Sequence, residues 1–496
     1  MTSHPTTQPA TAEDRRAGLP VAIIGAGPVG LAAAAQLLER GIEVIVLEAG
    51  DSAGAAVLDW GHTRLFSPWE YVVDEAAVRL LDDADWEAPH AKRLPSGREF
   101  VERYLAPLAA TAELAPRIRY GHRVTAVTRQ GMDRTRSAGR EAAPFLLRVD
   151  GVEGRGEVLA RAVIDASGTY STSNSIASSG IEPLGSDLVR EHLSRALPDV
   201  LGTDRARFAG RHTVVVGAGH SAANTLLKLA ALAEDEPGTT ITWAIRRGRP
   251  TRVYGSPADE LEARGALGSL AHGLVRSGAV ALLERFEIDE LAPTDDGQVR
   301  IHGRRAGEPL ALEADVIVNA TGFRPDLDLL REVRISLDEI VEAPKALAPL
   351  IDPNEHSCGT VYPHGVAELA HPERDFYIAG MKSYGRAPTF LLLTGYEQVR
   401  SIADELAGRH QAARIVHLVL PETGVCSTDD GSGSGTGAGA SGSCGVGVPA
   451  SDASVSDVSV SNSCSTSDGA TCAAPGVPDA SVGPQARTAL PLTLNR

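Results

Sequence analysis

The chain has 496 residues, 43% of them hydrophobic, and a formal net charge of −17. This length is enough for two or three domains, and the negative charge argues against a general affinity for nucleic acid or anionic membranes. No apolar run of about 18 residues occurs, so we expect no membrane-spanning segment. The polar N-terminus, 1–18, lacks the apolar core of a signal peptide, which favours a cytoplasmic location.

The first interpretable unit is a strand, a glycine-rich turn and a helix near the N-terminus. Val21–Ile24 is an apolar strand, and 31–40 is rich in alanine and leucine, as a helix requires. Between them, GAGPVG places glycines at Gly25, Gly27 and Gly30. The first permits the tight turn, the second lets the backbone approach a pyrophosphate, and the third lets helix and strand pack closely. The phosphate is expected at the helix N-terminus, where free N–H groups favour an anion.

The next strand, 43–47, is followed by Glu48, which lies 23 residues after Gly25. A carboxylate at this position accepts hydrogen bonds from ribose hydroxyls and repels a 2′-phosphate. This first unit therefore favours FAD or NAD and disfavours NADP. A tight turn without a ligand would explain the glycines alone, but it leaves the strand, helix and acid in register unexplained.

The same arrangement recurs later in the chain. Thr213–Val216 precedes GAGHSA, which places Gly217, Gly219 and Ala222 at the three positions, and a helix is expected over 220–233. Two such turns in one chain predict two bound dinucleotides.

The second unit differs where its ligand would be selected. Its next strand, 240–245, is followed by Arg246 and Arg247, with Arg249 close behind, where the first unit has its acid. Guanidinium groups pair bidentately with a 2′-phosphate, so this unit favours NADPH. The alternative is a solvated basic loop. His220, at the head of the helix, is interpreted as a capping or phosphate-side residue rather than a catalytic base.

Each unit is followed by an apolar strand that ends in a small hydroxyl residue and a glycine. Ala162–Asp165 leads into ASGT, which contains Gly168, and Val316–Asn319 leads into ATGF, which contains Gly322. With these four motifs in order, residues 20–420 resemble the two-dinucleotide flavoprotein oxidoreductases, which include thioredoxin reductases, flavin-containing monooxygenases and Baeyer–Villiger monooxygenases. The resemblance implies that these segments mark where the chain crosses between the two nucleotide domains.

The predicted fold class is α/β, with two Rossmann-like dinucleotide-binding domains and the NADPH domain inserted in a discontinuous FAD domain. We expect a disordered N-terminus at 1–19, the FAD domain at 20–184 and 325–420, the NADPH domain at 202–324, and a disordered Ser/Gly-rich tail at 421–496. The tail lacks aromatic residues over 427–486, so it cannot bury enough apolar area to offset the entropy of ordering.

Near the end of the folded part, the chain departs from disulfide reductases. Phe376–Gly380 is predicted as a buried strand, and Met381 follows where those enzymes usually have an aspartate that holds the flavin ribityl chain. This departure is similar to the monooxygenase branch, which also often has a glutamine at the position of Gln398, in the helix expected over 391–406. The resemblance thus implies that Gly380 and Gln398 bind the cofactor. The F-x-G-x-x-x-H fingerprint of that branch is not found ahead of the second glycine turn.

Cysteine placement also argues against disulfide reduction. The five cysteines are Cys358, Cys426, Cys444, Cys464 and Cys472, and no two form a C-x-x-C pair. A flavin disulfide reductase needs a thiol pair that exchanges a disulfide and contacts the flavin. The four tail cysteines fit a passive linker, with a thiophilic-ion or redox role as the alternative.

Cys358 lies in a loop-like run with His356 and His364, and His371 follows. These side chains could supply soft and borderline metal ligands, or a thiolate with a nearby base. Their spacing fits no standard zinc pattern, so no metal site is predicted. A plain structural loop is the alternative. Cys358, His364 and Lys382 are the candidate catalytic residues.

Two loops are candidates for the reactive pocket. Arg64–Trp69 follows the first unit, where related flavoproteins bring a loop over the flavin ring, and Lys382–Thr389 follows the presumed flavin strand. Loops that only connect elements explain the same residues. The stretch 354–398 is also similar to flavoproteins found beside arsenic-resistance genes, which fits a thiol-bearing pocket.

The resemblance implies an FAD-dependent, NADPH-consuming monooxygenase, in which hydride passes from NADPH to FAD and then to oxygen, with a small molecule as substrate. Two alternatives remain: an NAD(P)H-dependent flavin reductase or oxidase that passes electrons to a quinone or protein partner, and a non-catalytic flavin redox sensor. The sequence predicts neither the substrate nor the oligomeric state.

Overall fold

The structure is a computed structural model, and it describes residues 15–248, 262–352, 364–387 and 390–418. The chain divides into two units, 1–430 and 431–496, and all elements given below belong to the first. The predicted tail, 421–496, lies outside the described residues, as do Cys358, Arg249 and residues 1–14. None of the described helices is both long and apolar enough to cross a membrane.

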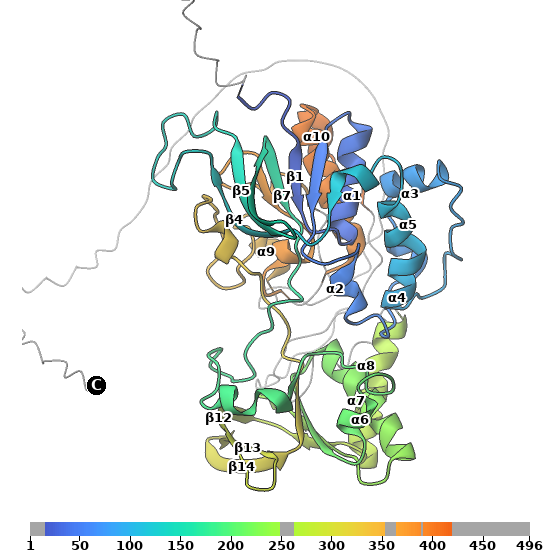
Figure 1. The fold of residues 1–496 in the computed structure, drawn as a ribbon. Coiled ribbons are helices and arrows are strands. Elements are labelled where there is room, and N and C mark those ends of the chain that lie inside the picture. The colour runs from blue at the N-terminus through green and yellow to red at the C-terminus, as the bar shows by residue number, and fades with distance from the viewer. Residues whose placement is uncertain (1–14, 249–261, 353–363, 388–389, 419–496) are drawn as a thin grey trace, which may run out of the picture. The chain divides into compact units, whose positions relative to one another are not determined.

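A first sheet contains five parallel strands in the order β16-β7-β1-β2-β3 (Figure 1). Its strands are β1 (Val21–Ile24), β2 (Val44–Leu47), β3 (Ile118–Arg119), β7 (Ala162–Asp165) and β16 (Phe376–Ile378). The central strand β1 pairs with both β2 and β7, so that Val21 lies opposite Val44 and Ala162. All residues of β1, β2, β7 and β16 are buried, as parallel strands are when both faces of the sheet are covered.

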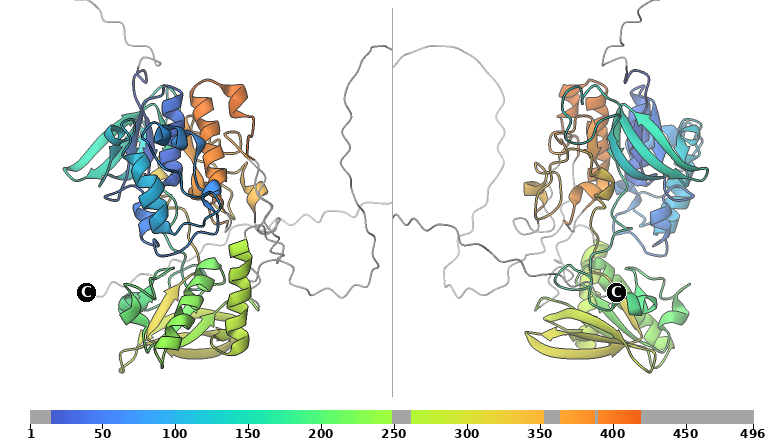
Figure 2. Two further views of the ribbon diagram at one scale, coloured as in Figure 1. Left: turned by 90° about the vertical axis from the view of Figure 1, so that its right-hand side faces the viewer. Right: turned by 60° about the vertical axis from the view of Figure 1, so that its left-hand side comes forward.

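Alternate residues of this sheet face two different layers. Val21 and Ile23 pack in the core with the helices, whereas Ala22 and Ile24 pack against an antiparallel sheet of three strands. The helices are α1 (Pro28–Glu39), α3 (Glu75–Asp82) and α10 (Leu392–Leu406), and the antiparallel strands are β4 (Arg123–Arg129), β5 (Phe145–Gly151) and β6 (Gly154–Ala160). Helices α1 and α10 lie side by side in Figure 2.

A second sheet contains five parallel strands in the order β11-β10-β9-β15-β8. Its strands are β8 (Leu193–Ser194), β9 (His212–Val216), β10 (Thr240–Ala244), β11 (Ala281–Leu283) and β15 (Val316–Asn319). All of them lie in the chain between β7 and β16 of the first sheet. The strand β8 precedes residue 202, at which the NADPH domain is predicted to begin.

The second sheet has the same layers as the first. Val215 and Val318 pack with helices α7 (His220–Asp235) and α8 (Glu262–Ser277). Val214 and Ile317, on the other face, pack against a second antiparallel sheet, formed by β12 (Phe286–Pro293), β13 (Val299–Arg305) and β14 (Glu308–Ala314).

The shorter helices are α2 (Ala55–Leu58), α4 (Gly97–Phe100), α5 (Ala106–Ala109), α6 (Arg205–Phe208), α9 (Ala348–Ile351), α11 (His410–Ala413), η1 (Trp69–Tyr71), η2 (Val101–Leu105), η3 (Ala115–Arg117), η4 (Ser186–His192), η5 (Asp328–Leu330) and η6 (Gly380–Tyr384).

The α/β fold class with two Rossmann-like sheets is confirmed, and the strands that flank the glycine turns fall where the sequence places them. The antiparallel sheets β4–β6 and β12–β14 were not part of the prediction. Their strands alternate buried and solvent-exposed residues, so charged side chains interrupt the apolar runs that identify the parallel strands.

The two segments that connect the sheets run beside each other. Ser173 forms an isolated bridge with Phe323. The Asn174 side-chain amide donates to the Thr321 carbonyl oxygen at 3.3 Å, and the Thr321 hydroxyl donates to the Asn174 carbonyl oxygen at 3.2 Å. The segment that contains Gly322 therefore lies against the chain that leaves the first sheet after β7.

Buried ion pairs join the first antiparallel sheet to the segment before β16. Arg129 and Arg140 both pair with Glu373, at 2.8 Å each, and all three side chains are almost fully buried. Arg16, at the end of the segment predicted as a disordered N-terminus, forms an ion pair with Asp375. These contacts fix the segment before β16 against the antiparallel layer.

Candidate nucleotide-binding and substrate sites

The first glycine turn has one crowded side and one open side. Gly25 has φ +101°, and a Cβ atom there would meet the Ala166 carbonyl oxygen at 2.9 Å. A Cβ atom at Gly30 would lie 2.0 Å from the Gly25 carbonyl oxygen. At Gly27, the N-cap of α1, no heavy atom lies within 4 Å of the Cβ position. The two outer glycines are therefore required by the fold, whereas the middle one leaves space for a ligand.

Glu48 lies beside this turn. Its Oε2 accepts a hydrogen bond from the Ala26 backbone N–H at 2.6 Å, and its Oε1 accepts one from the Gly50 N–H at 2.7 Å. The carboxylate is thus held at the end of β2 against the turn, at the edge of the sheet where a ribose would follow a bound pyrophosphate.

The second glycine turn repeats this geometry. Gly217 has φ +129°, and a Cβ atom there would lie 2.2 Å from the Ala320 carbonyl oxygen. Gly219, the N-cap of α7, has no heavy atom within 4 Å of its Cβ position, and Ala222 is fully buried at the third position. The Trp243 ring N–H donates to the Gly217 carbonyl oxygen at 2.7 Å, which fixes the turn to β10.

The hydroxyl–glycine segments pack on the first glycine of each turn and form the same local turn. The Asp165 Oδ1 accepts from the Ser167 hydroxyl at 2.7 Å, and the Asn319 Oδ1 accepts from the Thr321 hydroxyl at 2.6 Å. The glycines that follow, Gly168 and Gly322, have φ of +70° and +96°. Such φ values are accessible to glycine and strained for other residues.

Arg246 and Arg247 follow β10 and are exposed, as a role on a charged ligand requires. His220 is the first residue of α7 and directly follows the N-cap residue, Gly219. Its ring meets that of Phe66 edge-on, with the centroids 5.3 Å apart.

Lys382 lies in an environment that the sequence did not predict. Its Nζ donates to the Asp165 carboxylate at 2.7 Å and to the Ser167 hydroxyl at 3.0 Å. Both charged side chains are 0% exposed. The lysine thus joins η6 to the end of β7, directly beside the first nucleotide turn.

Gln398 and His364 belong to one buried network. The Gln398 Oε1 accepts from the Gly380 backbone N–H at 2.8 Å. Its Nε2 donates to the Ser383 hydroxyl at 2.9 Å and to the His364 Nε2 at 2.8 Å, which requires an unprotonated Nε2 on that imidazole. Gln398 is fully buried and bonds the main chain of Gly380, so it holds the turn that follows β16 in place.

The predicted cluster of Cys358 and histidines is only partly described, because Cys358 and His356 lie outside the described residues. His371 accepts a hydrogen bond from the Ser336 N–H at 3.3 Å, and its ring packs near that of Phe376. Within the described residues, no group of three or more potential ligands is placed to hold a metal ion.

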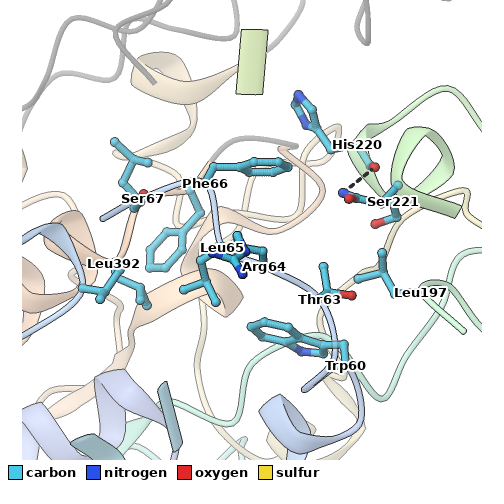
Figure 3. A pocket seen from close by; sticks show the side chains of 14 residues that line it. Trp60, Thr63, Arg64, Leu65, Phe66, Ser67, Leu197, His220, Ser221 and Leu392 are labelled. Atoms are coloured by element: carbon cyan, nitrogen blue, oxygen red, sulfur yellow. Dashed lines mark hydrogen bonds between the residues drawn. The ribbon is translucent and has the colours of Figure 1, made fainter. Parts of the chain in front are cut away.

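A cavity of about 300 Å³ lies where segment 60–72, the N-terminus of α7 and the start of α10 meet (Figure 3). Its wall is mostly apolar and includes the rings of Trp60 and Phe66. Polar groups in the wall include Arg64, Thr63 and Asn224. No carboxylate, and neither His364 nor Lys382, is among the described residues that line it.

Thr63 is the polar group in this wall whose burial points to a ligand. Its side chain is 6% exposed, and its hydroxyl has no hydrogen-bond partner among the described residues. A buried hydroxyl without a partner is unfavourable, so it is expected where a ligand completes the bonding. The Arg64–Trp69 loop that the sequence singled out contributes Arg64 to Ser67 to the cavity, but Thr63 itself gave no sequence signal.

The two sheets, each with a glycine turn and an open cradle at a helix N-terminus, define a protein with two dinucleotide-binding units. The chain belongs to the pyridine nucleotide-disulphide oxidoreductase family, whose model matches residues 22–358. A comparison with curated proteins gives no match.

Solved structures with this fold include enzymes of different activities. A bacillithiol disulfide reductase from Bacillus cereus is 20% identical, with a TM-score of 0.56, and the alignment covers 79% of this chain and 99% of that one. The cadaverine monooxygenase DfoA from Erwinia amylovora, bound to FAD, is 14% identical, with a TM-score of 0.54 and coverage of 82% and 99%. A flavin monooxygenase from Stenotrophomonas maltophilia is 22% identical, with a TM-score of 0.51 and coverage of 79% and 98%. These likenesses confirm the fold.

Proposed function

We propose that the protein is an FAD-dependent, NADPH-consuming monooxygenase of a small molecule. The observation that carries the proposal is the cavity of about 300 Å³, whose wall combines the segment after the first nucleotide unit with the head of the nucleotide helix of the second unit. A small, mostly apolar cavity with a few polar groups is typical of sites for small molecules. It favours a small substrate over electron transfer to a protein partner.

FAD fits the first unit. The open space at Gly27 and the N-terminus of α1 would take the pyrophosphate, and the Glu48 carboxylate would receive the ribose hydroxyls. When bound, the flavin would supply hydride acceptance from the nicotinamide and electron transfer to oxygen. Gly380, held by Gln398, and the Lys382–Asp165 pair would support the ring side of the site without being part of the cavity wall.

NADPH fits the second unit. Gly219 offers the same open cradle at the N-terminus of α7, and the exposed Arg246 and Arg247 stand where the first unit has its ribose carboxylate. Positive charge at this position favours a 2′-phosphate.

The family also contains disulfide reductases, but the residues here support that activity less well. The sequence has no C-x-x-C pair, and the described lining of the cavity contains no thiol. The apolar wall would instead exclude water from the reacting atoms, which protects reactive oxygen chemistry from side reactions. Thr63, Asn224 and Arg64 would orient the substrate.

The test uses the purified, flavin-loaded full chain. NADPH added without oxygen should bleach the flavin absorbance; a flavin that NADPH never reduces would indicate the redox sensor instead. In labelled dioxygen, with thioanisole as the probe, a monooxygenase should place labelled oxygen in the sulfoxide. Conversion of all oxygen to hydrogen peroxide, with faster NADPH oxidation when menadione is added, would favour the reductase.

A cavity-filling variant links that activity to the proposed site. Ser67 lines the cavity, so S67W should abolish probe oxidation and leave the flavin content unchanged. The matched control is S277W, on the exposed end of α8, which should retain both. Equal activity in the two variants would place the reaction elsewhere.

A further inference from the structure

Backbone hydrogen bonds tie the turn between β11 and β12 to the loop after β10. The Ile245 N–H donates to the Leu283 carbonyl oxygen at 2.9 Å, and the Phe286 N–H donates to the Ile245 carbonyl oxygen at 3.0 Å. Between them, the Arg285 N–H donates to the Arg247 carbonyl oxygen at 3.1 Å. Arg285, which is distant from Arg247 in sequence, is thereby fixed against it.

The guanidinium of Arg285 lies over Gly248. A Cβ atom built at Gly248 would be 3.3 Å from the Arg285 Nε and 3.6 Å from its Nη2. The missing side chain of Gly248 thus leaves the room that the guanidinium occupies. Arg246 and Arg247 immediately precede this glycine, so the three arginines gather at one corner of the second sheet.

The backbone of Arg285 is strained. Its φ is +54°, a left-handed conformation that is unfavourable for a residue with a branched or long side chain. Such strain persists where the surrounding structure imposes it, and it is common at functional sites. Glycine would fit this backbone better, so the stability of the fold does not explain the arginine.

The charges of the cluster are not neutralised within the described part of the chain. Arg246, Arg247 and Arg285 are all exposed, and none of them forms an ion pair with a described carboxylate. Exposed arginines on the neighbouring strand behave differently: Arg300 pairs with Glu313 at 2.7 Å and Arg304 with Asp289 at 3.0 Å. Among the described residues, therefore, no carboxylate compensates the positive charge at the corner after β10.

We propose that Arg285 is a third arginine of an anion site that, with Arg246 and Arg247, binds the 2′-phosphate of NADPH. This inference rests on the proposed use of NADPH and adds a residue that selects it over NADH. A phosphate presents three acceptor oxygens, and planar guanidinium groups can bind them in pairs. Gly248 leaves the Arg285 guanidinium free of crowding, because a Cβ atom there would already lie 3.3 Å from its Nε.

The experiment is isothermal titration of the flavin-loaded full chain with NADP⁺, NAD⁺, adenosine 2′,5′-bisphosphate and adenosine 5′-monophosphate. R285A should lower the affinity for both 2′-phosphorylated ligands by about tenfold to a hundredfold, the effect of losing one or two charge-assisted hydrogen bonds, and should leave NAD⁺ and adenosine 5′-monophosphate unchanged. R285K should retain part of the preference.

Two further variants separate binding from folding. R285G relieves the left-handed strain, so it should be at least as stable as the wild type to thermal unfolding and still lose the preference for the 2′-phosphate. R300A, which removes a paired surface arginine of the same domain, should bind all four ligands like the wild type.

The outcomes distinguish this inference from the proposed function. A wild-type protein that prefers NADP⁺ while R285A and R285G keep the full preference would overturn the role of Arg285 and leave NADPH use intact. A wild-type protein that binds NADP⁺ no better than NAD⁺ would overturn both.

Discussion

His371 shows how burial of a single side chain makes stability depend on pH. Its Nδ1 accepts from the Ser336 N–H, and its Nε2 has no partner among the described residues. Removal from water disfavours the charged imidazole and lowers its pKa from 6.5 to about 4. The unfolded chain binds a proton at this histidine near pH 6.5, whereas the folded protein does so only near pH 4. The stability that the neutral imidazole contributes is therefore fully present above the unfolded-state pKa and is lost as the pH falls through the folded-state pKa.

We predict that the wild type loses up to about 3 kcal/mol of unfolding free energy through this group between about pH 7 and pH 4. In H371N the side-chain oxygen can accept the Ser336 N–H without titrating, so this part of the pH dependence should disappear. Denaturant unfolding of the two proteins across the pH range measures the difference. H90N, at an exposed histidine, is the control and should keep the wild-type slope.

The buried Lys382–Asp165 ion pair is a second feature in which single side chains determine the stability of the protein. Removing one partner leaves an uncompensated charge in the core, so K382M should lower the free energy of unfolding by about 3 to 5 kcal/mol. The second sheet suggests a compensating substitution, because Asn319 forms after β15 the same turn that Asp165 forms after β7.

The double variant D165N/K382M should therefore regain most of the stability that K382M loses, since the introduced amide oxygen can still accept from the Ser167 hydroxyl and no charge remains buried. Denaturant midpoints of flavin-free protein compare the three forms. A loss of less than about 1 kcal/mol in K382M would mean that water reaches the Asp165 carboxylate.

At the scale of elements, the glycine turns separate what the fold needs from what a ligand needs. G25A places a Cβ atom 2.9 Å from the Ala166 carbonyl oxygen at a φ of +101°, so it should destabilise the flavin-free protein by about 2 kcal/mol or more. Gly27 has φ −79° and open space around its Cβ position. G27A should therefore change that stability by less than about 1 kcal/mol. Thermal unfolding of flavin-free protein checks both, and equal losses would show that the middle glycine is also structural.

How much of the structure can be predicted from the sequence also differs from one element to another. The strands β1, β7 and β15 are short apolar runs buried on both faces, and each ends at a glycine motif, so the sequence predicts their bounds correctly. The two-residue strands β3 and β8 exist only through pairing with distant neighbours and carry no pattern of their own.

For the candidate site, motif spacing predicts the residues but not the contacts that they make. Lys382 and Asp165 are 217 positions apart in the chain, so no local pattern could indicate their ion pair. Gln398 was assigned by resemblance to cofactor binding, and the structure shows how it acts on the neighbouring main chain, through Gly380. The strained φ of Arg285 has no sequence signature at all.

At the scale of the whole molecule, the repeated architecture implies that the two nucleotide units work as separate binding sites. Each unit has its own parallel sheet, its own helix N-terminus and its own antiparallel layer. The crowded contacts of Gly25 are with Ala166 and those of Gly217 with Ala320, so each turn is shaped by its own sheet.

Methyl groups placed in the two open cradles should therefore have independent effects. G27A should lower the flavin content of the purified protein and leave its affinity for NADP⁺ unchanged, because the methyl group occupies only the space at the first helix. G219A, whose Cβ position is equally open, should do the reverse and yield protein with full flavin content and weakened NADP⁺ binding. Flavin absorbance and NADP⁺ titration measure the two quantities in each variant. Loss of flavin in G219A would show instead that the second unit must be filled before the first can hold its cofactor, and the two sites would then be coupled in binding as well as in electron transfer.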